Sequence, residues 1–261
     1  MYLEYWGLSD KPFENTPDPR FLYPSEEHRE GLDRLLYAVS GEKGCAMLSG
    51  EYGCGKTILV RTLISRLDLE RYELALINYP IFDRENFLRE LSHQFGQSVT
   101  GRTRVEWFRE LSSFFYENLA TGKNNVLVID EAQIIEDPRV YEELRLLLNI
   151  QLEDRFLINV LLVGQPELRE RIMLHPQLDQ RIAVKFHLHR FDQPDSEGYV
   201  RHRLAVAGAQ REVFTQEALY LIYRMTNGVP RRINNLADLC LLEGANKKAP
   251  KVTEEIIKYV L

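Results

Sequence analysis

The sequence lacks the features of a membrane-spanning or exported protein. No apolar run among its 261 residues is long enough to cross a bilayer, and the apolar stretch 156–164 is short and contains Asn159. The amino terminus, Met-Tyr-Leu-Glu-Tyr-Trp, has neither the basic start nor the apolar core of a signal peptide. Internal repeats and low-complexity segments are also missing. We therefore expect a cytoplasmic chain without a membrane span.

Cysteine and histidine are too sparse for a disulfide scaffold or a conventional zinc site. The three cysteines, Cys45, Cys54 and Cys240, form no C-x-x-C pair, which favours free thiols in a reducing compartment. His187 and His189 would share one face of a strand, but no second ligand pair accompanies them. We predict structural roles for these two histidines.

The charge of the chain is unevenly distributed. The whole sequence has a net charge of −6, with 44% hydrophobic and 28% charged residues, which is ordinary for a soluble protein. Residues 196–261 contain ten Lys and Arg against seven Asp and Glu, a net charge of +3. A solvated helical surface explains this small excess better than a nucleic-acid interface, which stays as the alternative.

The segment 50–57 reads G-x-x-x-x-G-K-T and lies between the apolar segments 45–48 and 58–60. This order of strand, loop and helix wraps backbone N–H groups around the phosphates of a nucleotide, and the helix N-terminus favours the anion. We predict binding of ATP or GTP, with Lys56 at the outer phosphates and the Thr57 hydroxyl on Mg²⁺. The predicted phosphate loop consists of Gly50, Glu51, Tyr52, Gly53, Cys54, Gly55, Lys56 and Thr57.

An acidic pair follows the apolar run 126–129. Four consecutive apolar residues predict a strand buried on both faces, and ligands of open α/β sheets bind at the carboxyl ends of such strands. We predict that Asp130 completes the Mg²⁺ shell and that Glu131 orients and polarises the attacking water.

Alternating strand and helix patterns predict an α/β fold with a three-layer parallel sheet, followed by a small all-helical lid. Strands are expected at 74–77, 126–129, 158–163 and 184–188, and helices from 25 and over 84–97, 105–120 and 141–152. After residue 193 only helical patterns remain. We therefore predict an α/β nucleotide-binding domain over 1–193, with an extended strap at 1–24, and a helical lid over 194–261.

Three later positions are further candidates for the site. Gln165 ends the strand that we expect beside the Asp130 strand, where it would reach the γ-phosphate or its water; an ordinary polar turn residue is the alternative. Arg181 precedes the last strand at the domain rim, where it would point outward and act on a neighbouring subunit's nucleotide, or else form a surface salt bridge. Arg231 opens a lid helix after Gly-Val-Pro and would lean over the phosphates, with Arg232 as the competing choice and a solvated arginine as the alternative.

Together these features resemble an AAA+ ATPase, and more narrowly the ExeA/GspA-type ATPases associated with bacterial secretion, pili and exopolysaccharide export. The segments that carry the resemblance are 5–8, 11–13, 17–23, 129–133, 163–168 and 180–182. The resemblance implies Mg²⁺-dependent hydrolysis of ATP to ADP and phosphate, and self-association into a ring or filament in which Arg181 acts in trans. It also implies the roles given above for Lys56, Thr57, Asp130, Glu131, Gln165 and Arg231. Secretion members of the family continue into a membrane span and a periplasmic region, whereas this sequence ends at Leu261, as expected of an ATPase region or a stand-alone relative.

Two functions therefore compete. The first is an assembly ATPase that works with a protein partner in a secretion, pilus or polysaccharide-export machine, cytoplasmic and peripheral to the inner membrane through that partner. The second is an ATP-dependent DNA-binding switch like the transposition target selectors, supported by the mildly basic lid. A regulatory module that binds nucleotide without turnover is disfavoured by the intact Glu131.

Overall fold

The computed structural model describes residues 2–98, 100–152 and 155–261, which form two compact units. The sheet unit consists of Glu30–Gly50 and Leu63–Leu188. The helical unit consists of the residues up to Arg29, Glu51–Thr62 and His189–Leu261. The last of these segments starts close to the predicted boundary at 193. The residues up to Arg29 and residues 51–57 of the predicted phosphate loop, in contrast, group with the carboxyl-terminal helices, whereas Gly50 groups with the sheet.

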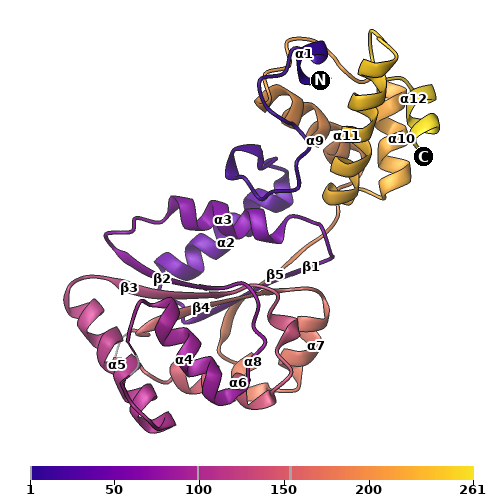
Figure 1. Cartoon of the computed structure of the whole chain (residues 1–261). Helices are drawn as coiled ribbons and strands as arrows, with labels where there is room; N and C mark the ends of the chain where they lie inside the picture. The colour runs from indigo at the N-terminus through magenta and orange to yellow at the C-terminus, as the bar shows by residue number, and fades with distance from the viewer. Residues whose placement is uncertain (1, 99, 153–154) are drawn as a thin grey trace. The chain divides into compact units, whose positions relative to one another are not determined.

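The sheet unit contains five parallel strands in the order β2-β3-β4-β1-β5 (Figure 1). Their bounds are β1 Cys45–Gly50, β2 Tyr72–Ile77, β3 Asn124–Ile129, β4 Ile158–Gly164 and β5 Ile182–Leu188. The predicted parallel sheet is confirmed, and so is the expected pairing of the Asp130 strand with the Gln165 strand, since Ile129 of β3 lies opposite Leu162 of β4. Because the strands are parallel, β1, β3 and β4 all end at the same edge of the sheet.

The core of the sheet unit follows from the period of two along each strand. Leu127 and Ile129 of β3 and Val160 and Leu162 of β4 point into one apolar cluster, while the residues between them face the other side. Five helices cover the first face (Figure 1). They are α4 Arg84–Gln94, α5 Arg104–Ala120, α6 Pro138–Leu147, α7 Glu167–Met173 and α8 Pro176–Asp179.

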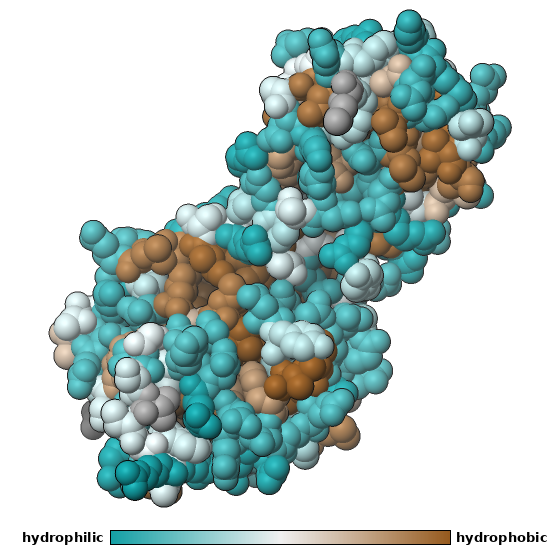
Figure 2. All heavy atoms as spheres, viewed as in Figure 1, coloured by the Kyte–Doolittle hydropathy of each residue, from teal (hydrophilic) through white to brown (hydrophobic). Residues whose placement is uncertain are grey.

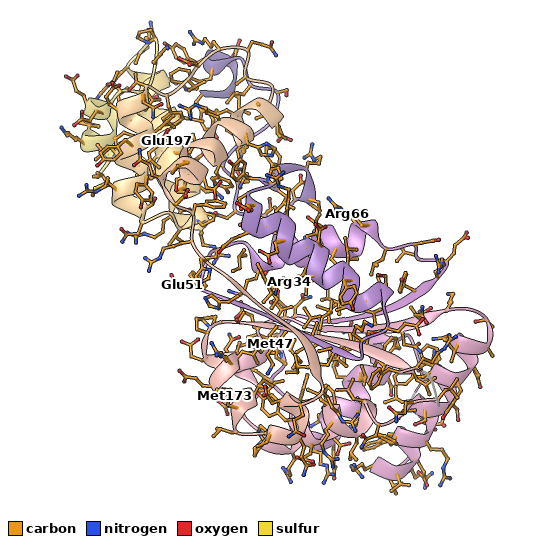
Figure 3. All side chains as sticks on the ribbon, turned by 180° about the vertical axis from the view of Figure 1, so that it is seen from behind. Arg34, Met47, Glu51, Arg66, Met173 and Glu197 are labelled. Atoms are coloured by element: carbon orange, nitrogen blue, oxygen red, sulfur yellow. The ribbon has the colours of Figure 1, made fainter. Side chains whose placement is uncertain are left out.

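The opposite face of the sheet is covered by parts of two helices that each begin in the helical unit. These are α2 Glu26–Ser40 and α3 Lys56–Arg66, of which residues 30–40 and 63–66 belong to the sheet unit. Figure 3 shows Arg34 of α2 and Met47 of β1 on opposite sides of the sheet. The Arg34 guanidinium lies 5.3 Å from the centroid of the Phe186 ring of β5, so it packs its charge against an aromatic face. The predicted three-layer arrangement is thus present.

Local capping signals set where the helices of the sheet unit begin. Thr103 and Glu106 form a reciprocal capping box at α5. Asp137 caps α6, and Pro138 occupies its first turn, so this helix starts three residues before the predicted Tyr141. Helix α6 also ends earlier than predicted, at Leu147, because the following residues turn into a short antiparallel bridge between Gln151 and Phe156.

The all-helical region predicted after residue 193 is present in the helical unit. Its helices are α9 Gln193–Val206, α10 Gln216–Thr226, α11 Pro230–Asn246 and α12 Glu254–Val260. Residues 2–6 form the short helix α1, and 19–21 form a 3-10 turn, η1, so the prediction of an extended strap over 1–24 was wrong in these places. Trp6 explains the first difference: its ring is 2% exposed and its Nε1 donates to the Leu241 carbonyl at 2.9 Å, which holds α1 against α11.

Four further features of the structure concern its surface, one cavity, the length of its helices and its cysteines. In the view of Figure 2 the surface is mainly hydrophilic, and its apolar groups gather in a few patches. A cavity of about 560 Å³ in the sheet unit is lined by residues 81–82, by α4 and by residues 97–98, and none of the predicted site residues is among them. Within 2–98, 100–152 and 155–261, no helix is long and apolar enough to cross a membrane. The three cysteines are buried free thiols.

Candidate nucleotide site

The predicted phosphate loop runs from the end of β1 at Gly50 to the start of α3 at Lys56. Gly53 and Gly55 have φ values of 79° and 103°, in the region that favours glycine. A Cβ at Gly53 would lie 2.9 Å from the Arg231 Cβ, and one at Gly55 would lie 3.0 Å from His28 Nε2. Both glycines are therefore required by conformation and by space.

The buried side chain of His28 hydrogen-bonds the backbone of this loop. His28 Nε2 lies 3.2 Å from the Cys54 carbonyl oxygen, and His28 Nδ1 lies 2.8 Å from Ser25 Oγ. Because a carbonyl can only accept, Nε2 carries the proton, and Nδ1 accepts from the Ser25 hydroxyl. Burial lowers the pKa of His28 to about 4, so the ring is neutral at physiological pH. Sequence reasoning missed this residue, since Ser25 and His28 read only as the start of a helix.

The other loop side chains are also held in place. Lys56 is only 6% exposed, and its Nζ donates to the Glu51 carbonyl at 3.0 Å, so the ammonium group stays over the loop. Thr57 follows it in the first turn of α3. Burial raises the pKa of Cys54 to about 11, which makes its thiol a poor nucleophile at neutral pH.

The acidic pair lies directly after β3. Asp130 is 5% exposed, and its Oδ1 accepts the backbone N–H of Glu131 at 2.9 Å. Glu131 has φ 53° and ψ 36°, a left-handed conformation that is uncommon for a residue with a side chain. Within the parts of the chain that the structure describes, no cluster of three or more histidine, cysteine or acidic residues forms a self-contained metal site.

The adjacency of β3 and β4 brings Glu131 and Gln165 together. Gln165 Nε2 lies 3.3 Å from Glu131 Oε2. A residue that the sequence did not single out, Gln133, joins them: its Nε2 donates to Glu131 Oε2 at 2.6 Å, and its Oε1 accepts the Gln165 backbone N–H at 3.0 Å. These three side chains form one hydrogen-bonded group at the sheet edge.

The two lid arginines behave differently. Arg231 begins α11, donates its backbone N–H to the Gly53 carbonyl at 3.3 Å, and places its guanidinium against the Tyr52 ring, where it also bonds the Tyr52 hydroxyl. Arg232 Nη2 instead donates to the Met225 carbonyl at 3.1 Å, in the last turn of α10. Of the two arginines, Arg231 is the one that contacts the loop.

Arg181 lies between α8 and β5, at the position expected from the sequence. Its side chain is half-buried rather than directed outward, since Nη1 donates to the Leu148 carbonyl at 3.2 Å. The two histidines are likewise engaged: His187 Nδ1 lies 2.9 Å from Ser49 Oγ, and His189 Nδ1 lies 2.7 Å from Glu27 Oε1.

Comparison with known proteins identifies the family to which this arrangement belongs. A family model described as an AAA domain matches residues 39–172, just over half of the chain. The chain belongs to the AAA domain family. It is also similar to general secretion pathway protein A of Aeromonas hydrophila, with 36% identity over 255 residues. That alignment covers 97% of this AAA chain but 46% of the relative, so the chain spans about half of the relative's length. The predicted resemblance to GspA-type AAA+ ATPases is confirmed.

Solved structures give the same fold at low sequence identity. The ORC2 protein of Aeropyrum pernix, in ADPNP–ADP complexes, superposes with a TM-score of 0.73 and 19% identity, over 97% of this AAA chain and 71% of the other. Drosophila ORC bound to DNA gives a TM-score of 0.73 and 19% identity, over 96% of this chain and 63% of the other. These likenesses establish the fold and leave the function to the site residues.

Proposed function

We propose that this AAA domain binds ATP with Mg²⁺ and hydrolyses it to ADP and phosphate. The proposal rests on one observation: three neighbouring parallel strands, β3, β4 and β1, all end at the same edge of the sheet. β1 leads into the phosphate loop at Gly50, β3 leads into Asp130 and Glu131, and β4 between them ends before Gln165. Ligands of open α/β sheets bind at this edge.

The residues of the loop and of the strand ends suit the cofactor. Left-handed Gly53 and Gly55 let backbone N–H groups approach a phosphate closely, and Lys56 carries the charge for the outer phosphates. The Thr57 hydroxyl and the Asp130 carboxylate are oxygen ligands of the kind that Mg²⁺ prefers. When bound, Mg²⁺ would neutralise charge that develops on the phosphates.

Glu131 is the residue that would act on water. In our proposal its carboxylate orients the attacking water and accepts a proton from it, while the Gln165 amide bonds either that water or the γ-phosphate. Arg231 would turn from Tyr52 toward the phosphates and report the nucleotide state to α11. Arg181 would supply positive charge to the nucleotide of a neighbouring subunit in a ring or filament, after giving up its bond to the Leu148 carbonyl.

Catalysis is tested by separating binding from turnover. Glu131→Gln is expected to keep its affinity for ATP and to lose roughly 10²- to 10⁴-fold in phosphate release, the usual contribution of a positioned base. Lys56→Ala is expected to lose ATP binding. Both are measured by fluorescent-nucleotide titration and by phosphate release with and without Mg²⁺. Wild-type turnover in Glu131→Gln would refute the proposed role of the carboxylate.

The cellular process to which hydrolysis is coupled is proposed from the similarity to the Aeromonas protein. We propose that hydrolysis supports the assembly of a secretion, pilus or polysaccharide-export machine through a protein partner at the inner membrane, because the Aeromonas relative is a general secretion pathway protein. Affinity capture with Glu131→Gln, which would hold the ATP-bound form, tests this. Enrichment of envelope-assembly proteins would support the proposal, and a set of partners without them would count against it.

DNA binding is the second candidate, favoured by the structural likeness to an ORC that is described as bound to DNA. Two of the lysines in the basic segment 196–261 are already paired with glutamates of the same segment: Lys247 pairs with Glu243 at 3.1 Å, and Lys251 pairs with Glu212 at 2.8 Å. Retention on duplex DNA in ATP at 50 mM salt, with a steep loss as salt rises, would support this function. No retention at that salt would remove it.

A further inference from the structure

Gln133 connects two strand ends through a single side-chain amide. It lies in the 3-10 turn η2, Ala132–Ile134, directly after Glu131, and it is only 8% exposed. Its Nε2 donates to Glu131 Oε2 at 2.6 Å, and its Oε1 accepts the Gln165 backbone N–H at 3.0 Å. The amide therefore fixes the Glu131 carboxylate to the end of β4.

The Glu131 carboxylate is oriented by this contact. The amides of Gln133 and Gln165 both donate to the same oxygen, Oε2, at 2.6 and 3.3 Å, and Oε1 accepts neither of these bonds. The shorter of the two comes from Gln133. Glu131 has a left-handed backbone conformation, which is uncommon for a residue with a side chain. The two amide donors hold its carboxylate at the end of β4.

The end of β4 is shaped to admit the Gln133 amide. A Cβ at Gly164 would lie 2.5 Å from Gln133 Oε1, closer than any side-chain carbon tolerates, and 3.0 Å from Leu168 Cδ2. Gly164 does not have a positive φ, so its backbone would accept alanine. Position 164 is therefore a glycine because the Gln133 amide occupies the space that a side chain would need.

We propose that Gln133 is a positioning residue for ATP hydrolysis, one that holds Glu131 so that Oε1 is the oxygen that accepts the proton of the attacking water. In this role Gln133 acts through the Glu131 carboxylate and makes no bond of its own to the nucleotide or the water. The inference rests on the function proposed above, in which Glu131 acts on water. It adds that the orientation of this carboxylate depends on an amide two residues further along the chain.

Three variants test the role. Gln133→Met keeps the length of the side chain and removes both hydrogen bonds. Gly164→Ala keeps Gln133 but displaces its amide, and so tests the same contact if Gln133→Met folds poorly. Gln94→Met is the matched control, because Gln94 Nε2 also donates to a glutamate, Glu90 Oε1, at 2.7 Å, on α4 of the same unit.

The expected result is a split between turnover and binding. Gln133→Met and Gly164→Ala should lose 10- to 100-fold in kcat, with the Kd for ATP within about twofold of wild type, whereas Gln94→Met should keep both. In the Glu131→Gln background, adding Gln133→Met should change the residual rate less than twofold, since the residue acts through Glu131. Wild-type kcat in folded Gln133→Met, or an equal further loss in the Glu131→Gln background, would overturn the proposal.

The same series separates this inference from the proposed function. If Glu131→Gln loses turnover while Gln133→Met and Gly164→Ala keep it, then the chain is an ATPase and only the positioning role fails. If the wild type releases no phosphate, or Glu131→Gln releases it at the wild-type rate, both fail together. The thermal unfolding midpoint of each variant is measured as well. A midpoint well above the assay temperature shows that any loss of kcat occurs in folded protein.

Discussion

The Arg231 guanidinium lies over the Tyr52 ring, with its central carbon 4.6 Å from the ring centroid. Tyr52 belongs to the phosphate loop and is 60% exposed, while Arg231 starts the 17-residue helix α11. A cation over an exposed tyrosine is stabilised by about 0.5–1 kcal/mol. Arg231, which we propose as the reporter of nucleotide state, is thus already in contact with a side chain of the phosphate loop.

This contact predicts that Tyr52 competes with ATP for Arg231. Tyr52→Ala should tighten ATP binding about two- to fivefold, because the arginine no longer leaves a ring when it turns toward the phosphates. Tyr52→Phe keeps the ring and should change affinity less, whereas Arg231→Ala should weaken binding. Fluorescent-nucleotide titration measures all three. Equal weakening by Tyr52→Ala and Arg231→Ala would show that the pair acts with the nucleotide rather than against it.

His28 predicts a loss of stability in acid. Burial holds its folded-state pKa near 4, below the ordinary value of 6.5, so the unfolded chain binds the proton more readily. The stability from the neutral ring is complete above pH 6.5 and declines as the pH falls from 6.5 toward 4. The full effect is on the order of 3 kcal/mol.

The comparison is made with His28→Gln, which cannot titrate but can still donate to the Cys54 carbonyl. Urea unfolding at pH 7, 6 and 5 should show wild type losing more stability than the variant over this range. Parallel losses in both proteins would mean that other groups govern the acid response.

Glu143 predicts a large effect on the stability of the sheet unit. Its carboxylate is fully buried on α6, where Arg104 Nε and Nη2 donate to its two oxygens at 2.7 and 3.0 Å and Arg84 makes a further ion pair. Glu143→Ala leaves two guanidinium groups without their anion, which should cost about 3–5 kcal/mol in the free energy of unfolding.

The neighbouring residue supplies the control for that measurement. Glu142 makes a half-exposed ion pair with Arg145 at 2.9 Å, so Glu142→Ala should cost about 1 kcal/mol or less. Urea unfolding curves of the two variants give the comparison. Similar losses in both would show that burial adds little to the Glu143 network.

The parts of the site that the sequence could predict are those that depend on local pattern. Apolar runs gave the strands, and the glycine spacing marked the loop before α3. The contact between His28 and Cys54 joins residues 26 positions apart, and nothing in the helical pattern around His28 indicates it. The left-handed Glu131 and the Gln133 bridge arise from a 3-10 turn too short to have a period. Helix α1 has five residues and depends on the burial of Trp6, so it also carries no periodic signal.

Arg181 predicts that activity is shared between subunits. Arg181→Ala should be inactive alone, with a loss of roughly 10³-fold or more if the arginine stabilises transition-state charge. Glu131→Gln should also be inactive alone. Mixed assemblies contain interfaces in which the Arg181→Ala subunit supplies Glu131 and the Glu131→Gln subunit supplies Arg181, so phosphate release should return in part. Arg169→Ala, at an exposed position of α7, should stay active and serves as the control. If mixing restores nothing while both variants still associate, then Arg181 acts within its own chain, where its bond to the Leu148 carbonyl already places it.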